Sequence, residues 1–255
     1  WISTATKPAS RSAENRSCNV NCENIVEIFA AIRIKLPPSH SRLTLCRGFD
    51  SVGADTPEGR EGRVSQDFKD RNFKGRPLRS SVTIEGIDRT PHRAFMRAMG
   101  LDDEAIGKPM IGIVSQQGEM TPCNMTHGQH VEWAHDGILA AGGTPRSFTT
   151  ISVSDGVGMA HEGMKFSLVS RELIADSIEA VVHGHAYDGL VGFGGCDKTL
   201  PGVLLGLVRC NVPSVFVYGG SALPGRFRGR DVSVLDAYEA VGAVQKGSMT
   251  EEELR

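Results

Sequence analysis

The sequence has few cysteines, few aromatic side chains and no long apolar run. Six Cys among 255 residues are too few for a disulfide scaffold, which favours a reducing compartment where thiols serve packing or metal binding. The longest stretch without a charged residue, 210–225, contains two Pro and three Gly, so the sequence predicts no transmembrane helix and no membrane partner. The chain has 28 Lys and Arg and 30 Asp and Glu, so neither sign of charge dominates. This balance disfavours nucleic acid as a partner.

The composition that is present, 40% hydrophobic and 23% charged residues, is typical of a globular protein with a real core. The two ends are less typical. The chain starts at Trp1, and Thr250 is followed three residues later by Glu253, the capping-box pattern of a helix that is just beginning. We therefore expect the sequence to be a fragment of a longer chain.

Residues 1–79 are rich in Ser, Arg and Pro, and their apolar patch at 25–36 is interrupted by charges. We expect them to be disordered, or to be an upstream extension translated in frame, rather than a folded domain. They lack the features of a secretory signal or a transit peptide. Cys18, Cys22 and Cys46 have no His or second close pair to complete a zinc site, although a metal-binding appendage stays open as the alternative.

From Ser80 onward, short apolar strands alternate with amphipathic helices, which predicts an α/β fold. The sheet should be parallel, with helices on both faces, as in an αβα sandwich. Strands are predicted at 110–115, 148–153, 190–193 and 214–218, and helices at 90–100, 128–141, 170–182, from 201, and at 234–244.

Four loops of unusual composition follow these strands, at 122–124, 154–156, 195–198 and 218–220. In an open parallel sheet, ligands bind outside the carboxyl ends of the strands. The four loops are therefore predicted to form one shared site.

Cys123 and Cys196 are the two thiols expected at this site. Two thiolates are too few for a closed iron-sulfur cluster, so they indicate either a site completed elsewhere or two unrelated buried thiols. Cys210, on a predicted apolar helix, is expected in the core.

Asp155, Asp197 and Lys198 are predicted beside those thiols. Carboxylate oxygens suit a hard divalent ion such as magnesium, but two aspartates make only a partial site. Asp155 could instead cap a turn through Asp-Gly chemistry. Glu119 and Glu162 are weaker candidates.

Other motifs suggest less. The segment 194–199 fails as a phosphate-binding loop because Asp197 stands where Gly is required before the Lys, and 192–194 lacks the third Gly of a dinucleotide fingerprint. His127, His130 and His135 invite a metal hypothesis. The HExxH pattern is absent, so surface or capping histidines are expected instead. His183 and His185 fit the C-terminal dipole of a helix.

Several motifs together are much more specific. They are residues 121–124 (TPCN), 151–156 (ISVSDG), 162–164 (EGM), 170–177 (SRELIADS), 195–202 (GCDKTLPG), 216–220 (FVYGG) and the segment 231–247. From about Ser80 to Arg255 the chain resembles the N-terminal domain of the dihydroxy-acid/6-phosphogluconate dehydratase family, which also holds sugar-acid dehydratases. Residues 1–79 do not resemble it.

The resemblance implies an enzyme that removes water from a 2,3-dihydroxy acid to give a 2-keto acid, as in valine and isoleucine biosynthesis. It assigns Cys123 and Cys196 to a 2Fe-2S cluster, with 4Fe-4S as the alternative, and Asp155, Asp197 and a carbamylated Lys198 to Mg²⁺. The third cluster Cys, a further carboxylate and the serine base of the family lie beyond Arg255. We therefore expect the 255 residues alone to be inactive.

The family also implies a homodimer when full length, and a cytoplasmic location in a bacterium or a mitochondrial or plastid one in a eukaryote. Two alternatives to a dehydratase acting on a dihydroxy-isovalerate type of substrate remain open. One is a sugar-acid (aldonate) or 6-phosphogluconate dehydratase of the same family. The other, of a different class, is a non-catalytic truncated remnant or binding module.

Overall fold

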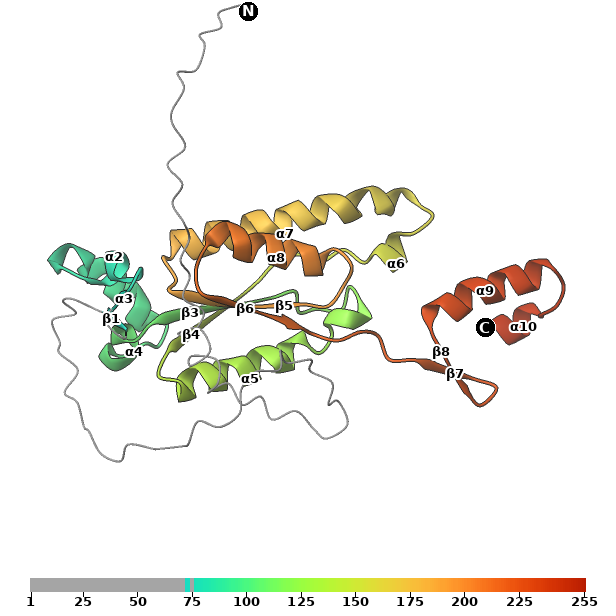
Figure 1. Cartoon of the computed structure of the whole chain (residues 1–255), viewed down its shortest axis with the longest axis horizontal. Helices are drawn as coiled ribbons and strands as arrows, with labels where there is room; N and C mark the ends of the chain where they lie inside the picture. Colours follow the sequence, from blue (N-terminus) through green and yellow to red (C-terminus); the bar gives the residue numbers. More distant parts are fainter. Residues whose placement is uncertain (1–71, 74–75) are drawn as a thin grey trace, which may run out of the picture.

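A four-stranded parallel sheet forms the centre of the molecule (Figure 1). The computed structural model describes residues 72–73 and 76–255. The strands are β3 (Met110–Ser115), β4 (Thr144–Thr149), β5 (Gly189–Gly194) and β6 (Ser214–Tyr218), and they lie in the order β4-β3-β5-β6. All three neighbouring pairs are parallel, which confirms the predicted α/β class.

Helices cover both faces of the sheet. On one face lies α5 (His127–Ala140), and on the other lie α7 (Lys165–Gly184) and α8 (Thr199–Cys210) (Figure 1). Each face has its own apolar core. Ile174, Ile178 and Val182 of α7 pack with Leu190 and Val203 on one side. On the other side the core residues are Ile111, Ile113, Ala134, Ile138, Val191 and Phe193.

The strand predictions are accurate for β3 and β6 but not for β4, which was expected at 148–153 and begins at Thr144. β4 contains Pro145, and proline is disfavoured inside a sheet because it cannot donate a hydrogen bond to a neighbouring strand. The sheet order resolves this, since β4 is an edge strand and pairs only with β3 within this sheet. An edge strand tolerates proline.

The helix predictions are close in position but less accurate at their ends. α7 starts at Lys165 rather than 170, and within it Leu173 is exposed whereas the neighbouring Ile174 is buried. The helix predicted at 90–100 is α3 (Thr90–Ala98), with Arg89 at the cap position. Gly100 follows the end of α3 with φ +86°, a left-handed conformation that favours glycine after a helix C-terminus.

Short elements precede the sheet. They are β1 (Asn72–Phe73), β2 (Arg76–Pro77), α2 (Ser81–Ile84), η1 (Ile87–Arg89) and α4 (Asp103–Gly107). The Asp188 carboxylate ties this part to the sheet, because it accepts hydrogen bonds from Ser80 N (2.9 Å) and Oγ (2.6 Å) and from Met110 N (2.8 Å). The predictions for 1–71, including those for Cys18, Cys22 and Cys46, lie outside the described residues.

Residues 225–255, named here the carboxyl segment, project from the far end of the sheet (Figure 1). They form β7 (Gly225–Phe227), β8 (Arg230–Val232), α9 (Val234–Gln245) and α10 (Glu251–Leu254). The capping box predicted at Thr250 and Glu253 is present, and a second one joins Ser233 and Asp236. In the described part of the chain, no helix is long and apolar enough to cross a membrane.

Candidate functional site

The four loops predicted to share a site do meet at one edge of the sheet. Because β4, β3, β5 and β6 are parallel neighbours, the loops that follow them open on the same side. We call these loops, 122–124, 154–156, 195–198 and 218–220, the carboxyl edge. A backbone hydrogen bond from Gly219 N to Gly194 O (2.9 Å) holds two of the loops together.

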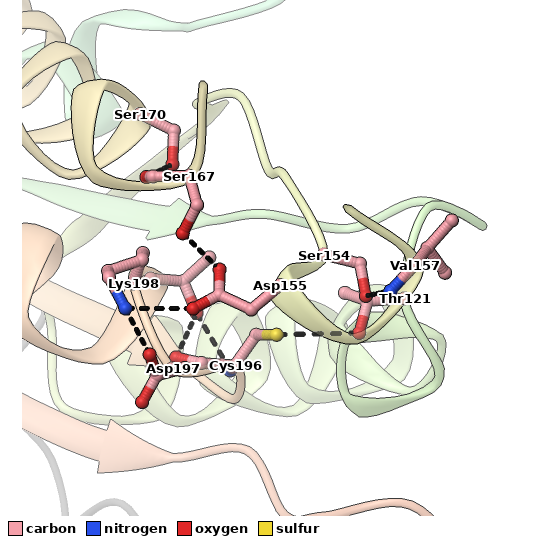
Figure 2. A network of polar contacts seen from close by, with 10 residues as sticks. Thr121, Ser154, Asp155, Val157, Ser167, Ser170, Cys196, Asp197 and Lys198 are labelled. Atoms are coloured by element: carbon pink, nitrogen blue, oxygen red, sulfur yellow. Dashed lines mark hydrogen bonds and ion pairs between the residues drawn. The ribbon is translucent and has the colours of Figure 1, made fainter. Parts of the chain in front are cut away.

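Lys198 joins the two predicted carboxylates (Figure 2). Its Nζ donates to Asp155 Oδ2 at 2.8 Å and also to Asp197 Oδ2. Ser167, at the start of α7, donates its hydroxyl to the other Asp155 oxygen. The side chains of Asp155 and Lys198 are 14% and 20% exposed, whereas Asp197 is 66% exposed, so the cluster faces solvent on the Asp197 side.

The charges in this cluster stabilise one another. Burial raises the pKa of the Asp155 carboxyl, but the hydrogen bonds from Lys198 and Ser167 outweigh it and bring the pKa below its usual value. The hydrogen bonds to Asp155 and Asp197 raise the pKa of the Lys198 ammonium. Lys198 is therefore a charged ammonium in this arrangement.

The alternative hypothesis that Asp155 caps a turn is wrong. The cap of α6 (Asp155–Gly158) is Ser154, whose Oγ accepts a hydrogen bond from Val157 N at 3.4 Å (Figure 2). This leaves the Asp155 carboxylate free to face Lys198. A capping serine next to the aspartate is a sequence signal that could have separated the two roles.

The two predicted thiols lie on neighbouring loops. Cys123 is in η2 (Pro122–Asn124) after β3, and Cys196 follows β5. The loops pack backbone to backbone, because a Cβ on Gly195 would lie 2.5 Å from Cys123 O. Thr121 Oγ1 lies 3.5 Å from Cys196 Sγ (Figure 2), and Thr199 Oγ1 accepts from Cys196 N at 2.8 Å.

The surroundings of the three described thiols differ. Cys123 and Cys196 are half-buried free thiols, while Cys210 is buried and burial raises its pKa. Cys210 is therefore a core residue, as predicted. Of the weaker candidates, Glu162 pairs with Lys165 in solvent and Glu119 is exposed.

The expectation of a surface or capping role is wrong for His127. Its side chain is 0% exposed, and its ring lies against Phe193 and His130, with centroid distances of 6.2 and 6.1 Å. Burial, together with the neighbouring His130, lowers the pKa of His127 to about 4, so the ring is neutral near pH 7. Near the other end of the sheet, His185 Nδ1 lies 2.9 Å from Val181 O, at the end of α7 as predicted.

Sequence reasoning missed several buried polar atoms in the segments that follow β3. Among the described residues, both ring nitrogens of His127, the side-chain amide of Gln116 and Oδ1 of Asn124 have no hydrogen-bond partner. Asn124 Nδ2 does donate to Ser152 Oγ at 2.9 Å. The sequence pattern around His127 does not distinguish a buried histidine from an exposed one.

The donor set fits part of a metal site. Two carboxylates provide hard oxygen donors, and two thiols lie close by with a hydroxyl near one sulfur. Among residues 72–73 and 76–255, no three His, Cys, Asp or Glu side chains are grouped closely enough to hold a metal ion. The residues present could thus supply some of the ligands of a metal group, and further donors would be needed to complete the site.

These features define an α/β domain with thiol, carboxylate and lysine side chains at the carboxyl edge of its sheet. The chain belongs to the dihydroxy-acid/6-phosphogluconate dehydratase family, because the sequence model of the N-terminal region of that family matches residues 108–255. The resemblance seen in the sequence motifs is confirmed.

Similar proteins carry names from the same family. The chain is 69% identical over 180 residues to dihydroxy-acid dehydratase 3 of Bradyrhizobium diazoefficiens, covering 71% of this chain and 31% of that protein. It is 57% identical over 177 residues to dihydroxy-acid dehydratase 2 of Bordetella bronchiseptica, covering 69% and 31%. For the dihydroxy-acid dehydratase of Pelagibacter ubique the identity is 52% over 183 residues, covering 72% and 32%. The chain spans about a third of the length of these relatives.

Proposed function

We propose that this chain supplies the amino-terminal part of the active site of a dehydratase that converts a 2,3-dihydroxy acid into a 2-keto acid. The observation that carries the proposal is the Lys198 cluster with Asp155 and Asp197, beside the loops of Cys123 and Cys196. The similarity to proteins named dihydroxy-acid dehydratase supports the same substrate class.

Two metal groups would be held by these residues. Cys123 and Cys196 would provide two thiolates to a 2Fe-2S cluster, with 4Fe-4S as the alternative, and Asp155, Asp197 and a carbamylated Lys198 would bind Mg²⁺. When bound, these groups supply Lewis-acid sites for the departing hydroxyl oxygen and for the substrate carboxylate. The third thiolate, a further carboxylate and the catalytic base would come from outside the 255 residues.

Lys198 would have to change its charge to act as a ligand. Its ammonium must first lose a proton. The neutral Nζ then forms a bond to the carbon of CO₂, one C=O electron pair moves onto oxygen, and a second proton leaves the nitrogen. The product is an anionic carbamate that faces Asp155 and Asp197, so a divalent cation is needed to offset three negative groups. Thr121 would meanwhile orient the Cys196 sulfur through its hydroxyl.

The finer assignments rest on family membership. We propose a dihydroxy-isovalerate type of substrate in valine and isoleucine biosynthesis, and a homodimer at full length. For a bacterial source we propose a cytoplasmic location, and for a eukaryotic source a mitochondrion or plastid. Free thiols and an iron-sulfur cluster are suited to a reducing compartment.

The test is turnover by the full-length protein. Anaerobically reconstituted enzyme is assayed for 2-keto acid formation from dihydroxy-isovalerate, from aldonates and from 6-phosphogluconate. We expect dihydroxy-isovalerate to give the highest kcat/KM. Preference for an aldonate or for 6-phosphogluconate would assign the protein to another substrate class of the same family. No turnover of any of these substrates by metal-loaded protein would favour a non-catalytic binding module.

Substitutions at the site and in the core should have different effects on turnover. Asp155→Asn and Cys196→Ser should each lower kcat/KM by about 100-fold or more, because each removes a group that holds a Lewis acid. Cys210→Ser is the matched control, since that thiol lies in the core, and it should retain turnover. The 255 residues alone should be inactive, and turnover by them would contradict the partial-site proposal.

A further inference from the structure

His127 fills the space in front of two glycines of the carboxyl edge. A Cβ on Gly219 would lie 2.3 Å from His127 Nε2 and 2.7 Å from Cδ2, and one on Gly195 would lie 3.0 Å from Nε2. Non-bonded heavy atoms do not approach each other that closely in protein interiors. The loops after β5 and β6 therefore come this near to α5 only because both positions are glycine.

The ring has little room to move. It is 0% exposed, and Phe193 and His130 flank it. Its side chain thus contacts the loop that leads to Cys196 and the loop after β6, while its own helix follows directly from the Cys123 loop. One buried ring thus touches two of the four loops of the carboxyl edge, and its helix follows directly from a third.

A purely space-filling role would not favour histidine at this position. An unpaired polar group inside a protein costs about 1–3 kcal/mol, yet neither ring nitrogen has a hydrogen-bond partner in the described part of the chain. An apolar side chain of similar size would avoid that cost. The buried polar ring, set against two glycines, indicates that its shape and position matter to the loops.

We propose that His127 is a positioning residue that sets the spacing between the Cys123 and Cys196 thiols by acting as a wedge between α5 and the loops at Gly195 and Gly219. The inference rests on the proposed role of the two thiols as ligands, but its steric part does not depend on iron or on turnover. Gly219 is its most specific partner, because the three nearest contacts of a Cβ there are all atoms of the His127 ring.

The test is a double-mutant cycle read with Cd²⁺ as a probe of the thiol pair. All proteins carry Cys18→Ser, Cys22→Ser and Cys46→Ser, so that the thiols left are those at positions 123, 196 and 210. Cd²⁺ affinity is measured by sulfur-to-metal absorbance, and folding by circular dichroism and thermal unfolding. Cys123→Ser must weaken Cd²⁺ binding, which establishes that the signal reports the pair.

We expect His127→Ala to weaken Cd²⁺ binding by about 10- to 100-fold while the protein remains folded, as for other groups that orient metal ligands. Gly219→Ala should weaken binding similarly in the parent but add little in the His127→Ala background, because the clashing ring is gone. Gly242→Ala, where a Cβ meets open space on α9, is the matched glycine control and should change nothing.

If His127→Ala does not fold, the cycle is repeated with His127→Val, which fills the space near the helix backbone but leaves the position of the ring nitrogens in front of Gly219 open. Equal effects of Gly219→Ala in both backgrounds would overturn the wedge. So would a folded His127 variant with unchanged Cd²⁺ affinity and only a lower unfolding temperature. An intact cycle together with no dehydratase turnover by the metal-loaded full-length protein would instead remove the proposed function and leave the wedge in place. Cd²⁺ binding unaffected by Cys123→Ser would remove both.

Discussion

The sheet with its carboxyl edge and the carboxyl segment are built from similar residues and pack very differently. Leu190 in β5 is 0% exposed, whereas Leu235 in α9 is 72% exposed. The core of the sheet is closed by α5, α7 and α8, but no residue of α9 or α10 is buried. Local signals such as capping boxes are thus enough to form a helix, and only tertiary neighbours give it a core.

The largest expected difference between the two regions comes from removing a leucine side chain. Leu190→Ala should lower the free energy of unfolding by about 3–5 kcal/mol, because the surrounding core cannot close the cavity. Leu235→Ala should change it by less than about 0.5 kcal/mol, since the side chain is already in solvent. Denaturant unfolding of both variants measures the contrast, and equal losses would show that α9 is packed against something in solution.

Acid should destabilise the carboxyl edge before the carboxyl segment. The pKa of His127 is about 4 in the folded chain and 6.5 in its ordinary environment, so between these values the unfolded chain binds a proton that the folded chain does not. Stability conferred by neutral His127 is therefore complete above pH 6.5 and is lost as pH falls toward 4, by up to about 3 kcal/mol. His130 contributes in the same direction, because burial lowers its pKa as well.

Unfolding measured from pH 7 to 4.5 checks this expectation. Hydrogen exchange should show the amides of β5 and β6 losing protection first, and His127→Leu should flatten the pH dependence. A profile that is equally steep in His127→Leu would show that the acid sensitivity comes from other groups.

A Gly→Ala substitution should lower the stability in the sheet region and raise it in the carboxyl segment. A Cβ on Gly206 in α8 would lie 2.9 Å from Ile178 Cβ, whereas one on Gly242 in α9 meets open space. Gly206→Ala should destabilise the chain by about 1–3 kcal/mol through overpacking. Gly242→Ala should stabilise it by about 0.5–1 kcal/mol, because alanine loses less backbone entropy in a helix.

Thermal unfolding of the two alanine variants provides the comparison. Ile178→Val, combined with Gly206→Ala, should recover part of the loss, since it removes Cδ1, which is one of the three Ile178 atoms nearest to the added Cβ. If Gly206→Ala were neutral on its own, α7 and α8 would be less tightly packed than the close approach indicates.

Much of the fold was accessible from periodicity and turn residues. The bounds of β3 and β6 were predicted correctly, because continuous apolar runs between polar turns identify buried strands. β4 was placed four residues late, since Pro145 is acceptable only at an edge, and edge position is a property of the sheet order. The start of α7 was missed because its first turns, with Phe166 and Leu168, are exposed despite being apolar.

The candidate site was predictable to the level of its loops. Strand order and parallel direction place the loops at one edge, so Cys123, Asp155 and Cys196 could be grouped in advance. Which side chains touch could not be predicted, because Lys198 reaches Asp155 across 43 residues of sequence. The burial of His127 was also out of reach, since an i, i+3 pair of histidines has the same pattern on an exposed helix as on a buried one.

The sequence by itself determined the alternation of strands and helices, the chemistry of the four loops and the membership of a dehydratase family. These depend on local periodicity and on motif residues. The tertiary structure alone decided that Lys198 binds both Asp155 and Asp197, that Ser154 rather than Asp155 caps α6, and that His127 lies against Gly195 and Gly219. Contacts of this kind arise only when segments distant in sequence pack together, because burial and side-chain pairing depend on neighbours that local sequence does not specify.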